Sequence, residues 1–266
     1  MQPRLIVFTD LDGTLLDHHS YSWRAAMPAV SRLCGHGIPL ILNSSKTAAE
    51  ISELQRTMGL RAPFIVENGA AVVIPQGCLG NDDDEVVHFG ASHEEVIRSL
   101  LVRREAGAHF RCFHDMSVDE LVQLTGLSAH GAEQAKQRLG TEPLLWEGSD
   151  EELVDFRTAL KGDGLRLVQG GRFLHAMGRF DKADGARFLL ERYREHYGDT
   201  PLVSIALGDS PNDQRMLEEA DIPVVIRGVN SDQLELPASS RPMRSLKPGP
   251  EGWNECVLNL LFEYGY

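Results

Sequence analysis

Two acidic segments of this sequence carry side chains that could hold a metal ion or exchange protons with a substrate. Asp10 and Asp12 follow the apolar run 4–9, and Asp209 follows the apolar run 202–207. Short, continuous apolar runs are typical of buried parallel strands. Because sites in open α/β sheets form beyond the carboxyl ends of the strands, we expect these carboxylates to lie close together. Carboxylate oxygens are ligands that a hard divalent cation such as Mg²⁺ prefers.

Both acidic segments also allow less specific interpretations. The Asp-x-Asp-Gly pattern at 10–13 is shared with calcium-binding loops and ordinary turns, although Gly13 would let the backbone turn sharply. In the second segment, Asp, Pro and Asn residues can form a turn that caps the next helix. A turn accounts for one acid, but it does not explain why Asp209, Asn212 and Asp213 all gather at one strand end.

Two further segments provide groups suited to binding an anion. Ser44, Ser45 and Lys46 follow a predicted strand at 38–42 and precede a predicted helix. Hydroxyl groups and backbone N–H groups at a helix start bind phosphate well. Lys182 opens another predicted helix and would add a positive charge. The alternatives are a serine that only caps a helix and a lysine that only faces solvent.

The elements that must position these groups alternate between strands and helices in both end regions of the chain. Thr47 and Glu50 have the spacing of a capping box at the start of one predicted helix. The predicted strands are 4–9, 38–42, 64–66, 71–74, 202–207 and 224–226, and the predicted helices are 22–34, 47–58, 182–196, 211–219 and 253–262. Strand–helix–strand alternation implies an α/β fold with a Rossmann-like parallel sheet.

The middle of the chain breaks this alternation and indicates an inserted domain. The acidic segment 81–85 is expected to be a solvated linker. Beyond it, strands and helices are mixed without strict alternation, which favours an α+β unit. The strands are expected at 86–89, 110–113, 143–146, 165–169 and 172–176, and the helices at 92–106, 117–125, 129–139 and 150–161. We therefore predict a core at 1–80 and 181–266 and an inserted domain at 81–180.

Composition limits the class of partner. The 266 residues carry a formal net charge of −13, which argues against nucleic acid or an anionic membrane surface. An anionic substrate must then be attracted by a local positive site. The four cysteines are scattered, no apolar stretch approaches the roughly 20 residues that span a bilayer, and the first residues do not resemble a signal peptide. We expect a cytoplasmic protein with free thiols, as a monomer or weak homodimer.

Together, these segments resemble the haloacid-dehalogenase phosphatases in residue type and in order. That superfamily has two aspartates at the start, then a Ser or Thr, a Lys, and a final Gly-Asp cluster. The resemblance implies that Asp10 is a nucleophile that carries the phosphoryl group and that Asp12 is the general acid and base. It implies a type-two cap between Ser44 and Lys182. It further implies phosphoryl binding by Ser44, Ser45 and Lys182, Mg²⁺ bound by Asp10, the Asp12 backbone carbonyl and Asp209, and supporting roles for Asn212 and Asp213.

Three further segments resemble the mannosyl-3-phosphoglycerate phosphatase family. They are Asn-Ser-Ser-Lys-Thr at 43–47, Glu-Asn-Gly-Ala at 67–70 and Gly-Pro-Glu-Gly-Trp at 249–253. This resemblance implies hydrolysis of a phosphomonoester on a small glycosylated three-carbon acid, with mannosyl-3-phosphoglycerate giving mannosylglycerate and phosphate. The alternatives are another sugar phosphate, glucosyl-3-phosphoglycerate, or a regulatory protein that binds phosphate without turnover.

Substrate recognition is expected mainly from the inserted domain. Arg172 and His175 lie on a predicted strand just before the chain returns to the core. An arginine suits a carboxylate such as that of glycerate, and a histidine suits a sugar or glycerate oxygen. The alternative is a surface arginine and a structural histidine. Lys46 and Asn68 would contact the substrate from the core, with Lys46 in place of an arginine found in related sugar phosphatases.

Overall fold

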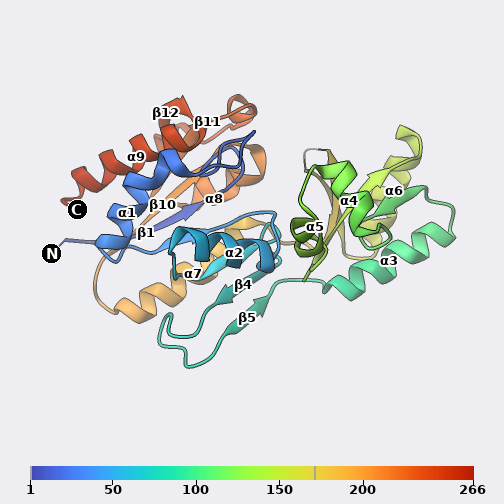
Figure 1. The fold of residues 1–266 in the computed structure, drawn as a ribbon, viewed down its shortest axis with the longest axis horizontal. Coiled ribbons are helices and arrows are strands. Elements are labelled where there is room, and N and C mark those ends of the chain that lie inside the picture. Colours follow the sequence, from blue (N-terminus) through green and yellow to red (C-terminus); the bar gives the residue numbers. More distant parts are fainter. Residues whose placement is uncertain (1, 171) are drawn as a thin grey trace.

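The computed structural model describes residues 2–170 and 172–266, which form two domains (Figure 1). The larger domain, the core, is built on a five-stranded parallel sheet with the order β12-β11-β10-β1-β2. Thr9 lies between Leu42 and Leu207 in the register of this sheet, so the segments after these three strands emerge side by side. The strands are β1 (Arg4–Thr9), β2 (Leu40–Leu42), β10 (Leu202–Gly208), β11 (Ile222–Arg227) and β12 (Met243–Pro248).

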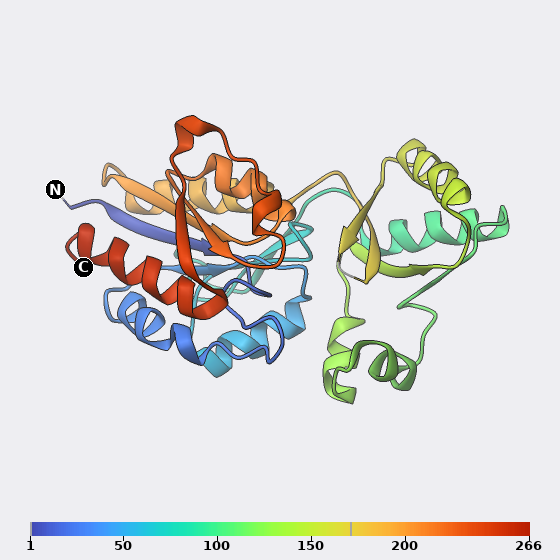
Figure 2. The same ribbon diagram turned by 90° about the horizontal axis from the view of Figure 1, so that it is seen from above.

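Helices cover both faces of the core sheet (Figure 2). Leu5 and Val7 of β1 pack in one hydrophobic cluster, and Ile6 and Phe8 pack in another on the opposite face. The helices on the first face are α1 (Met27–Gly35), α2 (Ala48–Met58) and α9 (Gly249–Glu263). Those on the second face are α7 (Lys182–Tyr197) and α8 (Gln214–Glu219). Because both faces are buried, the strands form continuous apolar runs in the sequence.

A separate antiparallel sheet lies at the edge of the core. Its strands are β3 (Phe64–Val66), β4 (Ala71–Ile74) and β5 (Glu85–His88), in that order. A parallel bridge between Asn43 and Ile65 joins it to the end of β2. The expectation that 71–74 continues the parallel sheet is wrong. The connection at 67–70 is too short for a crossover, so the chain turns back in an antiparallel hairpin.

The pairing of β5 also shifts the predicted domain boundary. β5 pairs along its whole length with β4, so it belongs with the core, although the sequence pattern assigns its residues to the inserted domain. The acidic segment 81–85 is therefore the end of a hairpin loop and not a linker between domains. Within it, Asp84 accepts a 2.7 Å hydrogen bond from the Gln76 N–H. We propose that the inserted domain begins after His88 and returns to the core near residue 181.

The inserted domain, hereafter the cap, is an α+β unit. Its four-stranded antiparallel sheet has the order β6-β7-β9-β8. Leu144 and Leu174 pack with α3 and α6 on one face, while Phe173 packs with α4 and α5 on the other. Met177, on the same face as Phe173, packs against Ala70, so this face looks toward the core. The elements are β6 (Phe110–Cys112), β7 (Thr141–Trp146), β8 (Arg166–Gly170), β9 (Phe173–Met177), α3 (His93–Glu105), α4 (Val118–Thr125), α5 (Ala129–Ala135) and α6 (Asp150–Gly162).

β12 and α5 are among the elements that differ from the prediction. The sequence pattern does not predict β12, because it is an edge strand in which only Ser245 is buried and no apolar run marks it. α5 ends at Ala135 and not at 139, because the chain turns there toward the core, where Arg138 donates a hydrogen bond to the Ser45 carbonyl. Both differences arise from contacts with distant parts of the chain.

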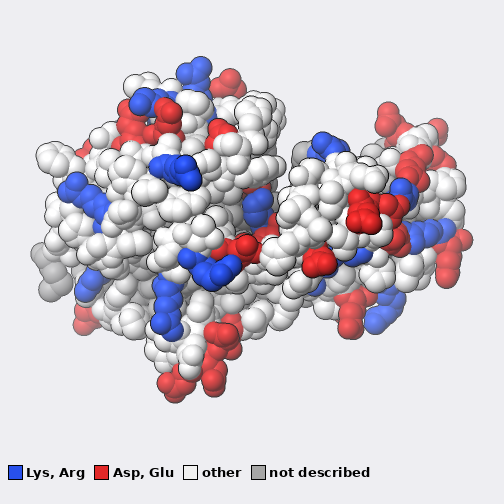
Figure 3. Space-filling model, in the orientation of Figure 1, with Lys and Arg blue, Asp and Glu red and all other residues white. Residues whose placement is uncertain are grey.

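Charged side chains are spread over the face seen in Figure 3. Lys and Arg lie among Asp and Glu there, and the surface is hollowed between the two domains. Among the described residues, no helix combines the length and apolar character that crossing a membrane requires. Because Lys and Arg are interspersed with Asp and Glu on the face in Figure 3, a positive site for an anionic ligand must lie within an individual group of residues.

Candidate active site

The strand ends of the core bring Lys182 and three aspartates into one buried cluster. Asp10 directly follows β1, Asp209 follows β10, and Asp213 comes four residues later. The Lys182 ammonium group bonds to Asp10 Oδ1 and, at 2.7 Å, to Asp213 Oδ1. Burial alone would lower the pKa of Lys182, but the charges of these two carboxylates outweigh it and raise that pKa. Lys182 therefore stays charged and holds Asp10, although a lone lysine usually faces solvent.

The carboxylate of Asp209 lies against two glycines. Its Oδ1 accepts a 3.1 Å hydrogen bond from the Thr14 hydroxyl. A Cβ atom at Gly13 would lie 2.7 Å from Asp209 Oδ2, and one at Gly228 would lie 2.4 Å from it. Gly13 also has a φ of +86°, which side chains rarely tolerate. Both positions therefore require glycine if the Asp209 carboxylate is to keep its place.

The three carboxylates carry more negative charge than Lys182 can balance. One oxygen of each of Asp10, Asp209 and Asp213 lies within 4.8 Å of the other two. Burial raises the pKa of Asp10 to about 8, with Lys182 opposing the rise and the other two aspartates adding to it. Burial, together with the charge of Asp213, raises the pKa of Asp209 to about 6. When ionised beside one ammonium group, three carboxylates leave two negative charges, which fits a divalent cation with oxygen ligands.

Asp213 is hydrogen-bonded on both of its carboxylate oxygens. Oδ1 accepts from Lys182, and Oδ2 accepts from the backbone N–H groups of Asp209 at 3.1 Å and Ser210 at 3.2 Å. Its side chain is fully buried. These bonds fix Lys182 and the loop after β10, which is compatible with the supporting role expected of Asp213.

Asp12 is paired separately, with Lys46. The Lys46 ammonium group donates a 2.9 Å hydrogen bond to Asp12 Oδ2 and lies 5.2 Å from the centre of the Tyr21 ring. Burial would lower the pKa of Lys46, but the charges of Asp12 and Glu50 and the hydrogen bond to Asp12 together raise it. Asp12 Oδ1 is buried and has no hydrogen-bond partner among the described residues. A buried polar atom of this kind is available for a bond to a bound ligand.

The predicted anion-binding segment lies next to the turn that carries Asn68. The Asn68 N–H donates a 2.8 Å hydrogen bond to the Ser44 carbonyl. Ser44 Oγ in turn accepts a 3.3 Å bond from the Lys46 N–H. The Asn212 side-chain amide lies 3.5 Å from Asn68 Oδ1. Together with the bond between Lys46 and Asp12, these contacts place the segment after β2 beside the acidic segments after β1 and β10.

The cap docks directly beside the same segment. Thr47 and Glu50 form the predicted capping box at the start of α2, and Thr47 Oγ1 also lies 2.9 Å from the Gln134 carbonyl of the cap. Arg138 of the cap donates a 3.0 Å hydrogen bond to the Ser45 carbonyl. Arg138 is absent from the predicted site residues, because no pattern in the sequence indicates that the chain approaches the core there.

Glu67 connects the two domains from inside the core. Its side chain is fully buried, and its carboxylate accepts hydrogen bonds from the N–H groups of Leu139 (2.6 Å), Gly140 (3.2 Å) and Thr141 (2.9 Å). The Thr141 hydroxyl adds a fourth at 2.7 Å. Glu67 and Asn68 have φ angles of 52° and 56°, which are uncommon for residues other than glycine. Strained backbone of this kind persists where the surrounding contacts hold it, as the cap does here.

The two cap residues predicted to bind substrate have different surroundings. Arg172 is exposed, and its guanidinium group donates to the Leu124 carbonyl at the end of α4, inside the cap. His175 lies on β9, on the face toward the core, and is 9% exposed. Burial, with the charge of Arg138 adding to it, lowers the pKa of His175 to about 3, so its ring is neutral. His175 therefore lies on the cap face toward the core, whereas Arg172 is bonded within its own domain.

The Gly-Pro-Glu-Gly-Trp segment supports the strand end that carries Asp10. Trp253 is fully buried, and its indole N–H donates a 2.9 Å hydrogen bond to the hydroxyl of Thr9, the residue before Asp10. A Cβ atom at Gly252 would lie 2.0 Å from the Lys247 carbonyl oxygen, so the first turn of α9 packs directly on β12. This segment therefore packs against the end of β1 that directly precedes Asp10.

Comparisons with known proteins agree with this geometry. Residues 7–115 match the family of haloacid dehalogenase-like hydrolases. The chain is 38% identical over 269 residues to the glucosyl-3-phosphoglycerate/mannosyl-3-phosphoglycerate phosphatase of Persephonella marina, and the match covers 97% of this chain and 98% of that protein. The chain belongs to the haloacid dehalogenase-like hydrolases. Within that family it is a phosphatase, as its sequence motifs implied.

Solved structures share the fold. A phosphatase of the haloalkanoate (HAD) superfamily from Bacteroides thetaiotaomicron has a TM-score of 0.67 and 18% identity, over 99% of this chain and 96% of that one. A sugar phosphatase of HAD subclass IIB has a TM-score of 0.64 and 16% identity, over 98% of this chain and 98% of that one. At these identities the likeness concerns the fold alone. It confirms the predicted α/β core with an inserted cap.

Proposed function

We propose that the chain is a Mg²⁺-dependent phosphomonoester hydrolase that forms an aspartyl-phosphate on Asp10 and converts mannosyl-3-phosphoglycerate to mannosylglycerate and phosphate. The reaction type rests on the buried contact of Lys182 with Asp10 and Asp213, beside Asp209. The substrate rests on the relative from Persephonella marina, whose name includes this compound and its glucosyl analogue. Glucosyl-3-phosphoglycerate is therefore the second candidate substrate.

The chemistry divides between Asp10 and Asp12. A carboxylate oxygen of Asp10 forms a bond to phosphorus, and the bond between phosphorus and the substrate's alkoxide oxygen breaks. Asp12, whose Oδ1 has no other partner among the described residues, gives a proton to that departing oxygen. Water then attacks phosphorus while Asp12 takes its proton, and the bond from phosphorus to Asp10 breaks to release phosphate. Lys182 offsets the repulsion between the Asp10 carboxylate and the phosphate throughout.

A bound Mg²⁺ ion would neutralise negative charge on the transferring phosphoryl group. Asp10, the backbone carbonyl of Asp12 and Asp209 would hold it. The unbalanced charge of the carboxylate cluster and its oxygen-only character support this assignment. Asp213 would keep Lys182 and the loop after β10 in position, since both of its oxygens are already hydrogen-bonded.

The phosphoryl group would lie against Lys182 and the hydroxyl groups of the segment after β2. Phosphoryl-binding residues in this proposal are Ser44, Ser45 and Lys182. Binding of the glycerate carboxylate would require another positively charged side chain near the segment after β2. Arg138 has this position, because it bonds to the Ser45 carbonyl. We add Arg138 to the predicted substrate-binding set of Lys46, Asn68, Arg172 and His175.

The proposal is tested by assaying the purified chain with Mg²⁺ against a panel of phosphomonoesters. The panel includes both glycosyl-3-phosphoglycerates, several sugar phosphates and a small aryl phosphate. Mannosyl-3-phosphoglycerate should give the highest kcat/KM. Asp10→Asn is the matched control, because its amide is nearly isosteric with the carboxylate but is a poor nucleophile.

Each outcome of this panel bears on one part of the proposal. A sugar phosphate without glycerate in first place would overturn the substrate assignment. Turnover that persists in homogeneous Asp10→Asn would remove Asp10 from its role. Absence of hydrolysis with every member would favour phosphate binding without turnover.

A further inference from the structure

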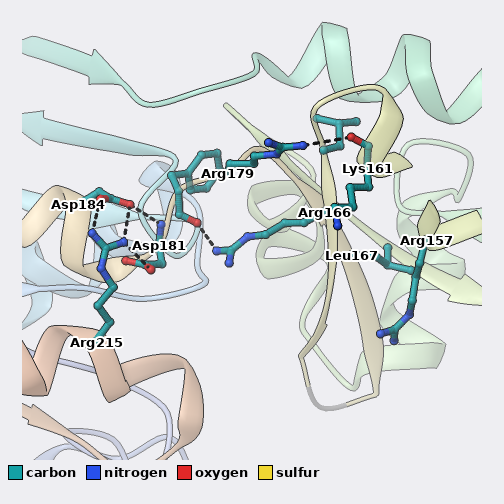
Figure 4. A pocket seen from close by; sticks show the side chains of 10 residues that line it. Arg157, Lys161, Arg166, Leu167, Arg179, Asp181, Asp184 and Arg215 are labelled. Carbon is teal, nitrogen blue, oxygen red and sulfur yellow. Dashed lines mark hydrogen bonds and ion pairs between the residues drawn. The ribbon is translucent and has the colours of Figure 1, made fainter. Parts of the chain in front are cut away.

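A cavity of about 540 Å³ lies where the cap, the connecting segment and the core meet (Figure 4). The cap contributes Arg157 and Lys161 of α6, the connecting segment contributes Arg179, and the core contributes Asp184 and Arg215. Within the described part of the chain, its lining includes no member of the carboxylate cluster of the active site. Its volume falls in the range of roughly 300–1,000 Å³ that small-molecule sites occupy.

Four basic side chains in this cavity have no acidic partner among the described residues. Arg166 donates to the Phe180 carbonyl, and Arg179 donates to the Lys161 carbonyl at 3.2 Å (Figure 4). Arg157 and Lys161 form no ion pair in that part of the structure. Such a gathering of unpaired cations is unexpected in a chain with a net charge of −13. Four positive charges that line one cavity favour the binding of an anion there.

The acidic residues of the cavity do not supply that anion. Arg215 donates to Asp181 at 2.9 Å and to Asp184 at 3.0 Å, so both carboxylates are already ion-paired with a side chain of the core (Figure 4). The Nε atom of Arg166 is buried and has no hydrogen-bond partner among the described residues. A buried donor without a partner is unfavourable, and native structures usually satisfy it with a ligand, an ion or water.

We propose that this cavity is a second binding site, for a small molecule with two or more phosphate or carboxylate groups. Guanidinium groups such as those of Arg166 and Arg179 bind these groups through paired hydrogen bonds. An occupant would touch the cap, the connecting segment and the core together. Asp181, which caps α7 immediately before Lys182, also lines the cavity. Binding there holds the two domains in one relative position.

The site is tested by isothermal titration of methylenediphosphonate into the intact chain at low salt. A chelator is present, so that metal-dependent binding in the active site does not contribute. Replacing Arg157 and Lys161 together with serine should weaken binding about tenfold or more, because two charged contacts are lost. The matched control replaces Arg56 and Arg98, which lie outside the cavity, and should leave the affinity unchanged.

A second control separates this cavity from the active site. Ser44→Ala alters the proposed phosphate-binding segment and should leave the affinity for the probe unchanged. Loss of binding in Ser44→Ala with retention in the Arg157/Lys161 variant would place the probe in the active site and overturn the proposal. Equal losses in the Arg157/Lys161 and Arg56/Arg98 variants would show that net charge alone drives binding, and would also overturn it. Circular dichroism checks that each variant is folded, and absence of binding to the wild-type chain at millimolar probe would contradict the site as well.

Discussion

Glu67 of the core accepts two hydrogen bonds from a single cap residue, Thr141: one from its N–H group at 2.9 Å and one from its hydroxyl at 2.7 Å. The N–H groups of Leu139 and Gly140 add two more donors. No part of the Glu67 side chain is accessible to water. This buried carboxylate, which directly follows the end of β3, therefore adds four hydrogen bonds to the contacts that Thr47 and Ser45 make with the cap.

Replacing this carboxylate should loosen the cap. Glu67→Gln keeps the shape of the side chain but removes its charge and turns an NH₂ group toward N–H donors. Each charge-assisted hydrogen bond lost is worth roughly 1.5–3 kcal/mol, so hydrogen exchange at residues 139–141 should become faster. Thr141→Val removes only the hydroxyl contact and should have a smaller effect. Unchanged exchange at 139–141 in Glu67→Gln would show that other contacts hold the cap.

Magnesium should be needed for turnover and should also stabilise the fold. A cation that binds only the native state raises the thermal midpoint, Tm. In Asp209→Asn, the Tm without metal should exceed that of the wild-type chain, because one buried negative charge is gone, and the response to Mg²⁺ should shrink. Differential scanning fluorimetry with Mg²⁺ and with chelator measures both effects. Turnover after exhaustive chelation, or an equal Tm response in Asp209→Asn, would contradict the proposed metal site.

The role of Asp12 should depend on the leaving group. Asp12→Asn cannot donate a proton, so hydrolysis of an alkyl phosphate should fall by about 10²- to 10⁴-fold. An aryl phosphate leaves as a more stable phenolate and should be affected much less. Steady-state kinetics on one substrate of each type makes the comparison. Equal losses on both types would mean that Asp12 is not the general acid.

Arg138 should matter more for substrate recognition than Arg172. Arg138 bonds to the Ser45 carbonyl, whereas Arg172 bonds to the Leu124 carbonyl within the cap. Arg138→Ala should lower kcat/KM for the glycosyl-phosphoglycerate by about 10- to 150-fold and change hydrolysis of a small aryl phosphate far less. Arg172→Ala is the matched comparison. A larger loss in Arg172→Ala would restore the recognition role predicted for it from sequence, and equal losses on both substrates would limit Arg138 to positioning the cap.

His175 should make the folded chain less stable in acid. Burial lowers its pKa from 6.5 to about 3 in the folded chain. Between these values the unfolded chain binds a proton that the folded chain does not, so this group makes the free energy of unfolding rise with pH by about 1.4 kcal/mol per unit. The penalty is absent above pH 6.5 and grows as the pH falls toward 3.

Denaturant unfolding at a series of pH values measures this penalty. In His175→Gln, the loss of stability between about pH 6 and pH 4 should be smaller than in the wild-type chain by roughly the amount assigned to His175. Carboxylates that titrate in the same interval contribute equally to both proteins. Identical slopes for the two proteins would show that His175 is protonated in the folded state.

The sequence by itself determined the local part of this structure. Apolar runs mark the buried parallel strands, so the places where β1, β2 and β10 end could be predicted. The capping box at Thr47 and Glu50 was equally predictable, because its two side chains are three residues apart and bond to nearby backbone. The α+β character of the cap could also be predicted, because local sequence patterns mark its strands and helices.

Only the tertiary structure decided which atoms of these groups bond to one another. Lys182 and Asp10 are 172 positions apart, and Glu67 and Thr141 are 74 apart. No local sequence pattern predicts contacts between residues so far apart. The hydrogen bonds of Lys182 and the contact of Glu67 with the cap are therefore seen only in the folded chain. The same holds for the antiparallel pairing of β5. Side chains at strand ends are placed by short-range backbone geometry, but their partners are chosen by how the sheet and the cap pack together.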